Sequence, residues 1–263
     1  MLERGVRQVR GITVATIPAD SGELDGFGEG LHGEVVRPED PNYDETRAIW
    51  NGMIDRQPAL IVRAMGVSDV IAAVDAAREH DLRLAVCGGG HNIAGNAVCD
   101  DGLMLDLSAM RSVRVDPETK TARVEPGATL ADVDLETQAF GLATPLGINS
   151  TTGVAGLTLG GGFGWLTRTY GMTVDNLRGV DIVTADGTLR HASETENADL
   201  FWGLRGGGGN FGVVTSFEFD LHEVGPEVLS GPVVYAGADA PDVLRHVRDF
   251  NEEAPEEAAV WIV

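Results

Sequence analysis

Runs of three or more consecutive glycines occur three times in this chain of 263 residues, at Gly88–Gly90, Gly160–Gly162 and Gly206–Gly209. With 35 glycines in total, chance would give only about 0.6 such runs. Each run lies between segments with strand or helix periodicity, where glycine permits positive φ and lets the backbone come close to a ligand. A tight turn explains any single run, but three together favour a bound ligand with an extended polar body.

The composition is that of a globular protein with a strongly acidic surface. Apolar residues make up 43% of the chain and charged residues 23%, so one large domain or two modest ones can bury a core. The formal charge is −22, and Lys120 is the only lysine. Such a surface repels phosphate backbones and anionic lipids, so we expect no nucleic-acid or membrane partner. A surface of this kind is also typical of proteins from concentrated salt.

Cysteine and histidine usage argues against disulfides and metals. Cys87 and Cys99 are too few for a secreted disulfide framework, and the six histidines lack metal-binding spacings. The first ten residues are charged and lead into no apolar segment of signal-peptide length. We therefore predict a cytoplasmic protein without a metal site, and the oligomeric state is left open.

Periodicity divides the chain into three parts. Residues 1–45 form an acidic, glycine-rich leader with little core of its own, residues 46–225 carry regular elements, and residues 226–263 begin a new pattern that closes no second core. Three consecutive strands between 103 and 125 are expected to be antiparallel. Expected strands are 59–63, 82–86, 103–107, 112–115, 121–125, 180–184, 188–191 and 213–221, and expected helices are 68–80, 129–140 and 199–204.

The sequence supports neither a Rossmann unit nor a Walker phosphate-binding loop. Residues 207–212 match G-x-G-x-x-G by letter, but a helix precedes them and a strand follows, which is the reverse of a dinucleotide-binding Rossmann unit. No Walker lysine follows a glycine loop. Residues 88–92 are better placed, because a buried strand delivers consecutive backbone N–H groups that can wrap a pyrophosphate. His91 at the end of this loop is either a hydrogen-bonded loop histidine or a reactive group.

Five segments in sequence order resemble the FAD-linked oxidases. They are residues 86–92 (VCGGGHN), 153–164 (GVAGLTLGGGFG), 170–177 (YGMTVDNL), 183–187 (VTADG) and 199–215 (DLFWGLRGGGGNFGVVT). The pattern is similar to the berberine-bridge-enzyme-like and 6-hydroxynicotine-oxidase-like branch of the vanillyl-alcohol-oxidase type, over about residues 45–225. Any one segment is weak evidence, but five in order are specific.

The resemblance implies FAD as the cofactor, bonded covalently through His91 to the 8α carbon of the isoalloxazine ring. Neutral imidazole suits this role, and attachment raises the flavin potential and prevents cofactor loss. Val214 is implied near the adenosine half. The other implied cofactor-binding residues are Val86, Cys87, Gly88, Gly89, Gly90, Asn92, Gly153, Val154, Ala155, Gly156, Leu157 and Phe163.

Two departures from the family pattern matter. Some relatives attach the flavin a second time through a cysteine, and the matching position here is Asn149, so a single bond is expected. Family members are also longer, and their tyrosine or acidic catalytic bases often come from the later part. Residues 226–263 would supply only the opening strand and helix of a substrate domain, so the chain is expected to be C-terminally truncated, and no catalytic base is assigned.

These inferences predict an α+β protein with a PCMH-type FAD-binding domain of two α/β lobes. A βαβ-containing lobe is expected at about residues 50–110 and a mainly antiparallel lobe to about 225, with FAD between them. The implied activity is hydride transfer from a C–H bond of an alcohol, sugar or amine to the flavin, with O₂ as acceptor. The alternatives are a dehydrogenase that uses another acceptor and a non-catalytic flavin-binding fragment.

Overall fold

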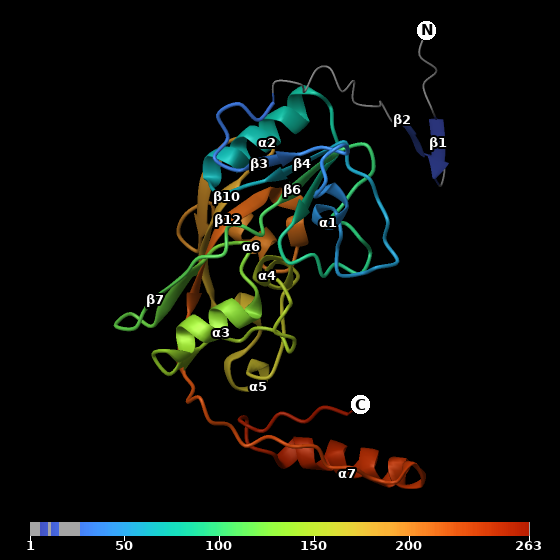
Figure 1. Ribbon diagram of the computed structural model, residues 1–263. Coiled ribbons are helices and arrows are strands. Elements are labelled where there is room, and N and C mark those ends of the chain that lie inside the picture. Colours follow the sequence, from blue (N-terminus) through green and yellow to red (C-terminus); the bar gives the residue numbers. More distant parts are fainter. Residues whose placement is uncertain (1–5, 10–11, 16–26, 263) are drawn as a thin grey trace. The chain divides into compact units, whose positions relative to one another are not determined.

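The computed structural model describes residues 6–9, 12–15 and 27–262 (Figure 1). The backbone divides into two compact units, Met1–Met110 with Val183–Arg190, and Arg111–Ile182 with His191–Val263. Both units combine helices with sheets, so the expected α+β fold with two lobes is confirmed.

Unit 1 is built on a four-stranded sheet in the order β3-β4-β6-β5. β4 and β5 run parallel to β6, and β3 runs antiparallel to β4. A separate antiparallel pair, β1 with β2, precedes the sheet in the chain. The elements are β1 (Val6–Val9), β2 (Ile12–Ala15), β3 (Glu34–Val36), α1 (Tyr43–Thr46), β4 (Leu60–Arg63), α2 (Val67–Glu79), β5 (Leu84–Cys87) and β6 (Leu103–Asp106).

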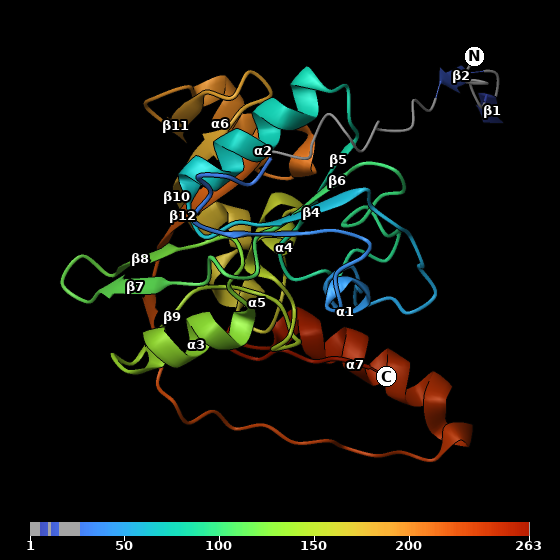
Figure 2. The ribbon, with the colours of Figure 1, turned by 45° about the horizontal axis from the view of Figure 1, so that its top comes forward.

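Helix α2 supplies the crossover between the parallel strands β4 and β5 and packs against β6 (Figures 1 and 2). Its Val70, Ala73 and Ala77 side chains are buried at helical spacing. All four residues of β6 are buried, as is typical of a parallel strand covered on both faces. The predicted βαβ arrangement is therefore present.

Two local expectations in unit 1 are wrong. The strand expected at 103–107 pairs parallel with β4 and β5, and not antiparallel with the strands that follow it. Its unbroken apolar run needs cover on both faces, which the middle of a parallel sheet provides. The helix expected to be capped by Ser68 begins at Val67 instead, with the Asp69 carboxylate accepting the Met65 backbone N–H at 2.9 Å.

Part of the segment before residue 46 belongs to the folded core of unit 1. Val36 and Tyr43 are buried, and the Tyr43 hydroxyl donates to the Pro58 carbonyl at 2.6 Å. The buried Asp69 carboxylate also accepts the backbone N–H groups of His32 and Gly33 at 2.9 and 3.0 Å. The leader was expected to have little core, and these residues depart from that because distant groups bind them.

Unit 2 contains most of a five-stranded sheet in the order β11-β10-β12-β8-β7 and a small antiparallel pair, β9 with β13. β8 is antiparallel to both of its neighbours, β7 and β12, and the β7–β8 hairpin is plain in Figure 2. The strands are β7 (Val113–Asp116), β8 (Thr121–Val124), β9 (Leu142–Ala143), β10 (Leu177–Val183), β11 (Leu189–Ser193), β12 (Val213–Asp220) and β13 (His222–Glu223). The helices are α3 (Leu130–Gln138), α4 (Val154–Leu159), α5 (Thr167–Tyr170), α6 (Ala198–Leu204) and α7 (Ala240–Glu253), and the 3₁₀ turns are η2 (Thr173–Asn176), η3 (Gly208–Phe211) and η4 (Gly237–Asp239).

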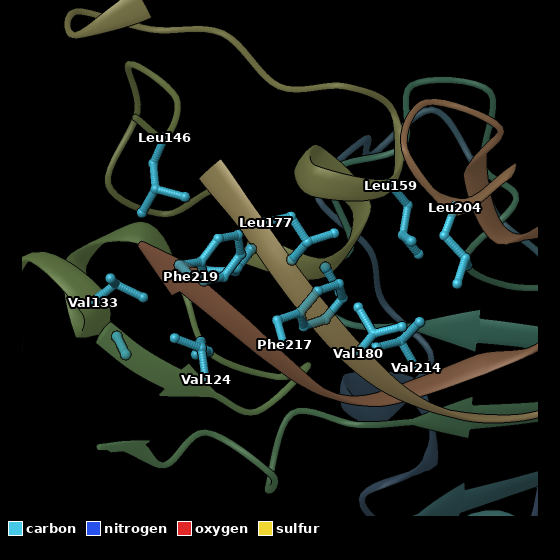
Figure 3. Packing of buried hydrophobic residues seen from close by; sticks show 14 of the residues in the cluster. Val124, Val133, Leu146, Leu159, Leu177, Val180, Leu204, Val214, Phe217 and Phe219 are labelled. Atoms are coloured by element: carbon cyan, nitrogen blue, oxygen red, sulfur yellow. The ribbon is translucent and has the colours of Figure 1, made fainter. Parts of the chain in front are cut away.

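Strand β12 carries the centre of the unit 2 core (Figure 3). Phe217 and Phe219 are fully buried on one face, with ring centroids 6.0 Å apart, while the residue between them is partly exposed. This alternation is the pattern that predicted the strand. The packed side chains around them include Val124, Val133, Leu146, Leu159, Leu177, Val180, Leu204 and Val214.

The rejection of a Rossmann unit is supported by the local structure. After helix α6, residues 208–211 form the short turn η3, and strand β12 follows directly. No helix opens after these glycines, so no helix N-terminus faces a pyrophosphate at this point.

Beyond residue 225 the described chain forms helix α7 and no strand. The expected helix is therefore present and the expected opening strand is not. Arg168 of α5 contacts this segment, because its guanidinium donates to the carbonyls of Asn251 and Ala254 at 2.9 and 2.8 Å. Among the described residues, no helix has the length and apolar character needed to cross a bilayer.

Replacing Phe217 with alanine tests the core of unit 2. The substitution leaves a cavity among fully buried side chains and should lower the free energy of unfolding by about 3–5 kcal/mol. Trp202→Ala is the control, because that indole is 76% exposed and its loss should cost far less. Urea denaturation followed by circular dichroism measures both, and equal effects would contradict the assigned core.

Candidate functional site

The first glycine run lies at the carboxyl edge of the parallel strands of unit 1. Cys87, the last residue of β5, is in register with Asp106 of β6, which is in register with Arg63 of β4. Gly88–Gly90 follow at once. Ligands of open α/β sheets bind beyond the carboxyl ends of the strands, so this loop lies where a nucleotide is expected.

The backbone of this loop offers two donors to a ligand. Gly90 has φ +68°, a left-handed conformation that glycine adopts without strain. Within residues 27–262, the backbone N–H groups of Gly88 and Gly89 donate to no other group of the chain. Consecutive backbone N–H groups of this kind are the donors that bind phosphate groups. The residues present therefore fit a pyrophosphate.

Val86 and Cys87 differ in what they can offer a ligand. The Val86 side chain is 37% exposed, whereas Cys87 is buried on the other face of β5. Burial raises the pKa of the Cys87 thiol to about 12, and the Asp106 carboxylate adds to this rise. The thiol is therefore neutral near pH 7, and Cys87 can present backbone atoms but no thiolate.

Asn92 is part of the turn that closes the loop. Its side-chain Oδ1 accepts the Asn96 backbone N–H at 3.1 Å, and its carbonyl accepts the Gly95 N–H at 3.0 Å. The Asn92 carboxamide thus has a local structural partner, and its contact with a cofactor stays a prediction.

Trp50 is a residue of this loop region that sequence reasoning missed. Its indole stacks on the His91 imidazole, with ring centroids 5.1 Å apart and planes inclined by 21°. Its backbone N–H also donates to the Gly90 carbonyl at 3.2 Å. The two residues are forty-one positions apart and no periodicity links them, so only the folded chain reveals the pair.

In unit 2, residues 153–157 form the start of helix α4. Gly153 is the residue before the helix and pairs with Thr129 in an isolated antiparallel bridge. The Val154 and Ala155 side chains belong to the hydrophobic core, whereas Gly156 is exposed. A cofactor contact at Val154 or Ala155 would therefore use backbone atoms.

The second glycine run makes a tight turn that only glycine can complete. Gly162 has φ +71°, and a Cβ placed on it would lie 2.3 Å from Thr173 Oγ1 and 2.6 Å from Leu157 Cδ2. The carbonyls of Gly161 and Gly162 accept the backbone N–H groups of Val174 and Thr173, at 3.1 and 3.0 Å. The turn is thereby fixed against η2, so two of the resembling segments, 153–164 and 170–177, lie in contact.

Three threonine hydroxyls of unit 2 are buried with no hydrogen-bond partner among the described residues. They are the Oγ1 atoms of Thr144, Thr158 and Thr173, the last against the Gly162 turn. Buried hydroxyls normally have partners, and an orphan of this kind is an observation that fits a bound polar group. Together with the narrow glycine turn, they are compatible with a cofactor beside this part of unit 2.

Phe163, which follows the turn, is 59% exposed and stacks on Trp261 at a centroid distance of 6.1 Å. Trp165 contacts the same indole at 5.2 Å with a tilt of 59°. The three rings form an exposed aromatic group on unit 2. The predicted flavin contact of Phe163 is untested by these contacts.

Val214 has a different environment from the loop residues. It lies in β12, is almost fully buried and packs in the unit 2 core. A core residue at this position is sufficient to explain the valine, and its contact with the adenosine half stays a prediction.

The structure therefore brings the predicted residues together in two groups. Val86 and Cys87 end β5 and Gly88–Asn92 continue as the loop of unit 1, while Gly153–Leu157 and Phe163 precede and follow one glycine turn of unit 2. Val214 belongs to unit 2 but to its core. Among residues 27–262, no three His, Cys, Asp or Glu side chains form a group able to hold a metal ion.

The comparison with known families decides the identity of this arrangement. The profile of the FAD-binding domain family matches residues 58–193, which include both glycine turns. This chain belongs to the FAD-binding domain family. The resemblance to FAD-linked oxidases of the vanillyl-alcohol-oxidase type is confirmed.

Individual relatives of this FAD-binding domain agree with that assignment. (R)-6-hydroxynicotine oxidase of Paenarthrobacter nicotinovorans is 39% identical over 206 residues, 78% of this chain and 45% of that protein. The crystal structure of 6-hydroxy-D-nicotine oxidase from Arthrobacter nicotinovorans superposes with a TM-score of 0.84 at 36% identity, covering 88% of this chain and 51% of that one. A structure of glucooligosaccharide oxidase from Acremonium strictum, which carries a 6-S-cysteinyl, 8α-N1-histidyl FAD, has a TM-score of 0.70 at 38% identity and covers 73% and 41% of the two chains. The chain spans about half the length of the curated relatives it matches.

Two alanine substitutions within one glycine run test the turn of the FAD-binding domain. Gly162→Ala places a Cβ against Thr173 at a positive φ, so the free energy of unfolding should fall by about 2–5 kcal/mol. Gly160→Ala is the matched control, because its Cβ would meet no atom closer than 3.4 Å and its φ is −85°. Thermal denaturation compares the two, and equal stability would show that the turn is not constrained as described.

Thiol chemistry tests the burial of Cys87. In the native FAD-binding domain at pH 8, we expect Ellman's reagent to modify neither cysteine rapidly, since both are buried and the pKa of Cys87 lies near 12. After denaturation both thiols should react, and Cys87→Ser should leave one. Rapid modification of Cys87 in the native protein would contradict its burial.

Because the pKa of Cys87 is raised in the folded state, the contribution of Cys87 to stability is complete below pH 9 and is lost as pH rises toward 12.

Proposed function

We propose that this protein is an FAD-dependent oxidoreductase of the oxidase type, with its flavin bonded covalently through His91. The observation that carries the proposal is the loop after β5. It places backbone N–H groups without a partner in the described chain at Gly88 and Gly89, three and two residues before His91, inside the region that matches the FAD-binding domain family.

Backbone donors suit this chain as ligands for a pyrophosphate. The protein has 41 acidic residues against 19 basic ones, so cationic side chains are scarce. Glycine N–H groups supply partial positive charge without a cation and without a Cβ in the way. In this proposal Val86–Asn92 hold the pyrophosphate and the ring edge, and residues 153–157 with Phe163 continue the contact with the flavin.

The single covalent bond follows from comparing two positions with a relative. The FAD of the glucooligosaccharide oxidase structure has both a cysteinyl and a histidyl bond. In this proposal His91 takes the histidyl position. Asn149 stands at the expected cysteine position, and its Oδ1 accepts the Thr151 backbone N–H and hydroxyl at 3.1 and 2.9 Å. A carboxamide cannot form a thioether, so His91 is the one attachment point proposed.

When bound, the flavin supplies the chemistry by accepting a hydride and passing electrons to O₂. The chain's own residues bind and orient it, and His91 tethers it and raises its potential. The substrate proposed is a small molecule with a C–H bond next to oxygen or nitrogen. The named relatives include a hydroxynicotine oxidase and a glucooligosaccharide oxidase, which support amine and sugar substrates as the first to test. Two free thiols support a cytoplasmic location as part of the proposal.

Acid denaturation tests the tether. We expect yellow flavin to stay with the acid-precipitated wild-type polypeptide and to be released from His91→Ala, because no bond would hold it. His246→Ala, a histidine of α7, is the control and should retain the colour, since α7 lies outside the resembling segments. Absorbance of pellet and supernatant gives the result, and colour retained by His91→Ala would move the attachment to another residue.

Peroxide release separates the functional alternatives. Flavin bleaching by an amine or an oligosaccharide followed by hydrogen peroxide in air identifies an oxidase. Bleaching that is reversed only by an added electron acceptor identifies a dehydrogenase. A tethered flavin that none of the amines, alcohols or sugars bleaches identifies a flavin-binding protein without this activity.

A further inference from the structure

The indole of Trp50 covers one face of the imidazole at which we propose flavin attachment. We propose that Trp50 is the positioning residue of this reaction, which holds His91 in the orientation that bonds to the flavin. The inference rests on the proposed function and adds a residue that lies outside the five resembling segments. The two rings are nearly parallel, at 21°, with centroids 5.1 Å apart.

Backbone and side-chain contacts fasten the Trp50 segment to both sides of His91. On one side the Trp50 N–H donates to the Gly90 carbonyl at 3.2 Å. On the other side Asn51 Nδ2 donates to the Ile93 carbonyl at 3.0 Å. These hydrogen bonds hold the Trp50 segment beside His91, because they join it to the residues on both sides of that histidine.

The support beneath Trp50 is itself anchored in unit 1. Ile49 and Ile54 pack on the buried cluster that contains Cys87 and Met104. Ile54 also lies against Gly95, where an added Cβ would come within 2.8 Å of it. The Arg47 guanidinium pairs with Asp44 and Asp55 and donates to the Arg56 carbonyl at 3.0 Å. The segment that carries the indole is thus attached to the core of unit 1 through Ile49 and Ile54.

Trp50 is poorly explained as a core residue. Its side chain is 61% exposed, while the core of unit 1 uses mainly small and aliphatic residues. Large aromatic side chains bury most of their area when packing is their role. Stacking on a single imidazole instead limits rotation of that ring about its Cβ–Cγ bond, and this is the contribution a positioning group makes.

Orientation matters because attachment is a substitution at one carbon. A bond forms between an imidazole nitrogen of His91 and the 8α carbon, while one N–H bond of the imidazole and one C–H bond of the 8α methyl group break. The two protons and two electrons released pass to O₂, which is reduced to hydrogen peroxide. The nitrogen must face that carbon for the bond to form, and a ring free to rotate spends less time in this geometry.

The test compares attachment with binding in the full chain prepared without flavin. Covalent attachment is followed after FAD addition as flavin fluorescence on a denaturing gel. Trp50→Leu should attach FAD roughly tenfold more slowly, since loss of one aromatic stack on a reacting group has about this effect on a rate. Trp50→Phe keeps a stacking ring and should stay within about threefold of wild type. Trp202→Leu, which replaces another exposed indole, should attach at the wild-type rate.

Two further measurements distinguish positioning from a general structural effect. In a His91→Ala background, Trp50→Leu should change the noncovalent affinity for FAD by less than about twofold, because only the orientation of His91 depends on it. In the flavin-free wild type, ring current from Trp50 should shift the His91 Cε1–H proton resonance upfield, and Trp50→Leu should remove that shift. The His91 resonance of the wild type tests the stack even where a variant folds poorly.

Three results would contradict the roles proposed for Trp50 and His91. Attachment by Trp50→Leu at the wild-type rate overturns the positioning role. An equal loss of rate and of noncovalent affinity shows that Trp50 contacts the flavin and does not position His91. Acid-stable flavin on His91→Ala overturns the proposed tether instead, and the resonance shift then still reports whether the two rings stack.

Discussion

Open backbone donors at the carboxyl edge of a parallel sheet are the constraint on which the proposed chemistry depends. β5 ends at Cys87, and the next residues, Gly88 and Gly89, leave their N–H groups without partners in the described chain. Glycine lets a ligand come close to the backbone, and an acidic protein has few cations to replace these donors. The end of β5 in the sheet determines where the loop begins, and His91 is the fourth residue after that end.

In unit 2 a glycine is required for a different reason, namely the lack of space for a Cβ at Gly162. Its glycine turn is narrow because Thr173 and Leu157 occupy the space that a Cβ at Gly162 would need. Hydrogen bonds from η2 hold the turn in place, so segments 153–164 and 170–177 depend on each other for their shape. The family match across residues 58–193 spans both units and includes four of the five resembling segments.

Many local elements could be predicted because their patterns are short-range. The alternation in β12 and the Thr129 start of α3 are both found where expected. The placement of β6 was wrong, since an apolar run of four residues does not say which strands it will join. The part played by Val36 and Asp69 in the core of unit 1 was also hidden, because their partners lie in other elements.

By itself the sequence determined the FAD-binding family and the positions of the glycines in its turns, because positive φ and close approach select glycine locally and the motif order is specific. Only the tertiary structure decided which of the predicted site residues have side chains that a ligand can reach. It buried Cys87 and Val214, gave Asn92 a local partner and placed Trp50 on His91. Burial and ring stacking depend on contacts between distant residues, and no pattern along the chain encodes the distance between them.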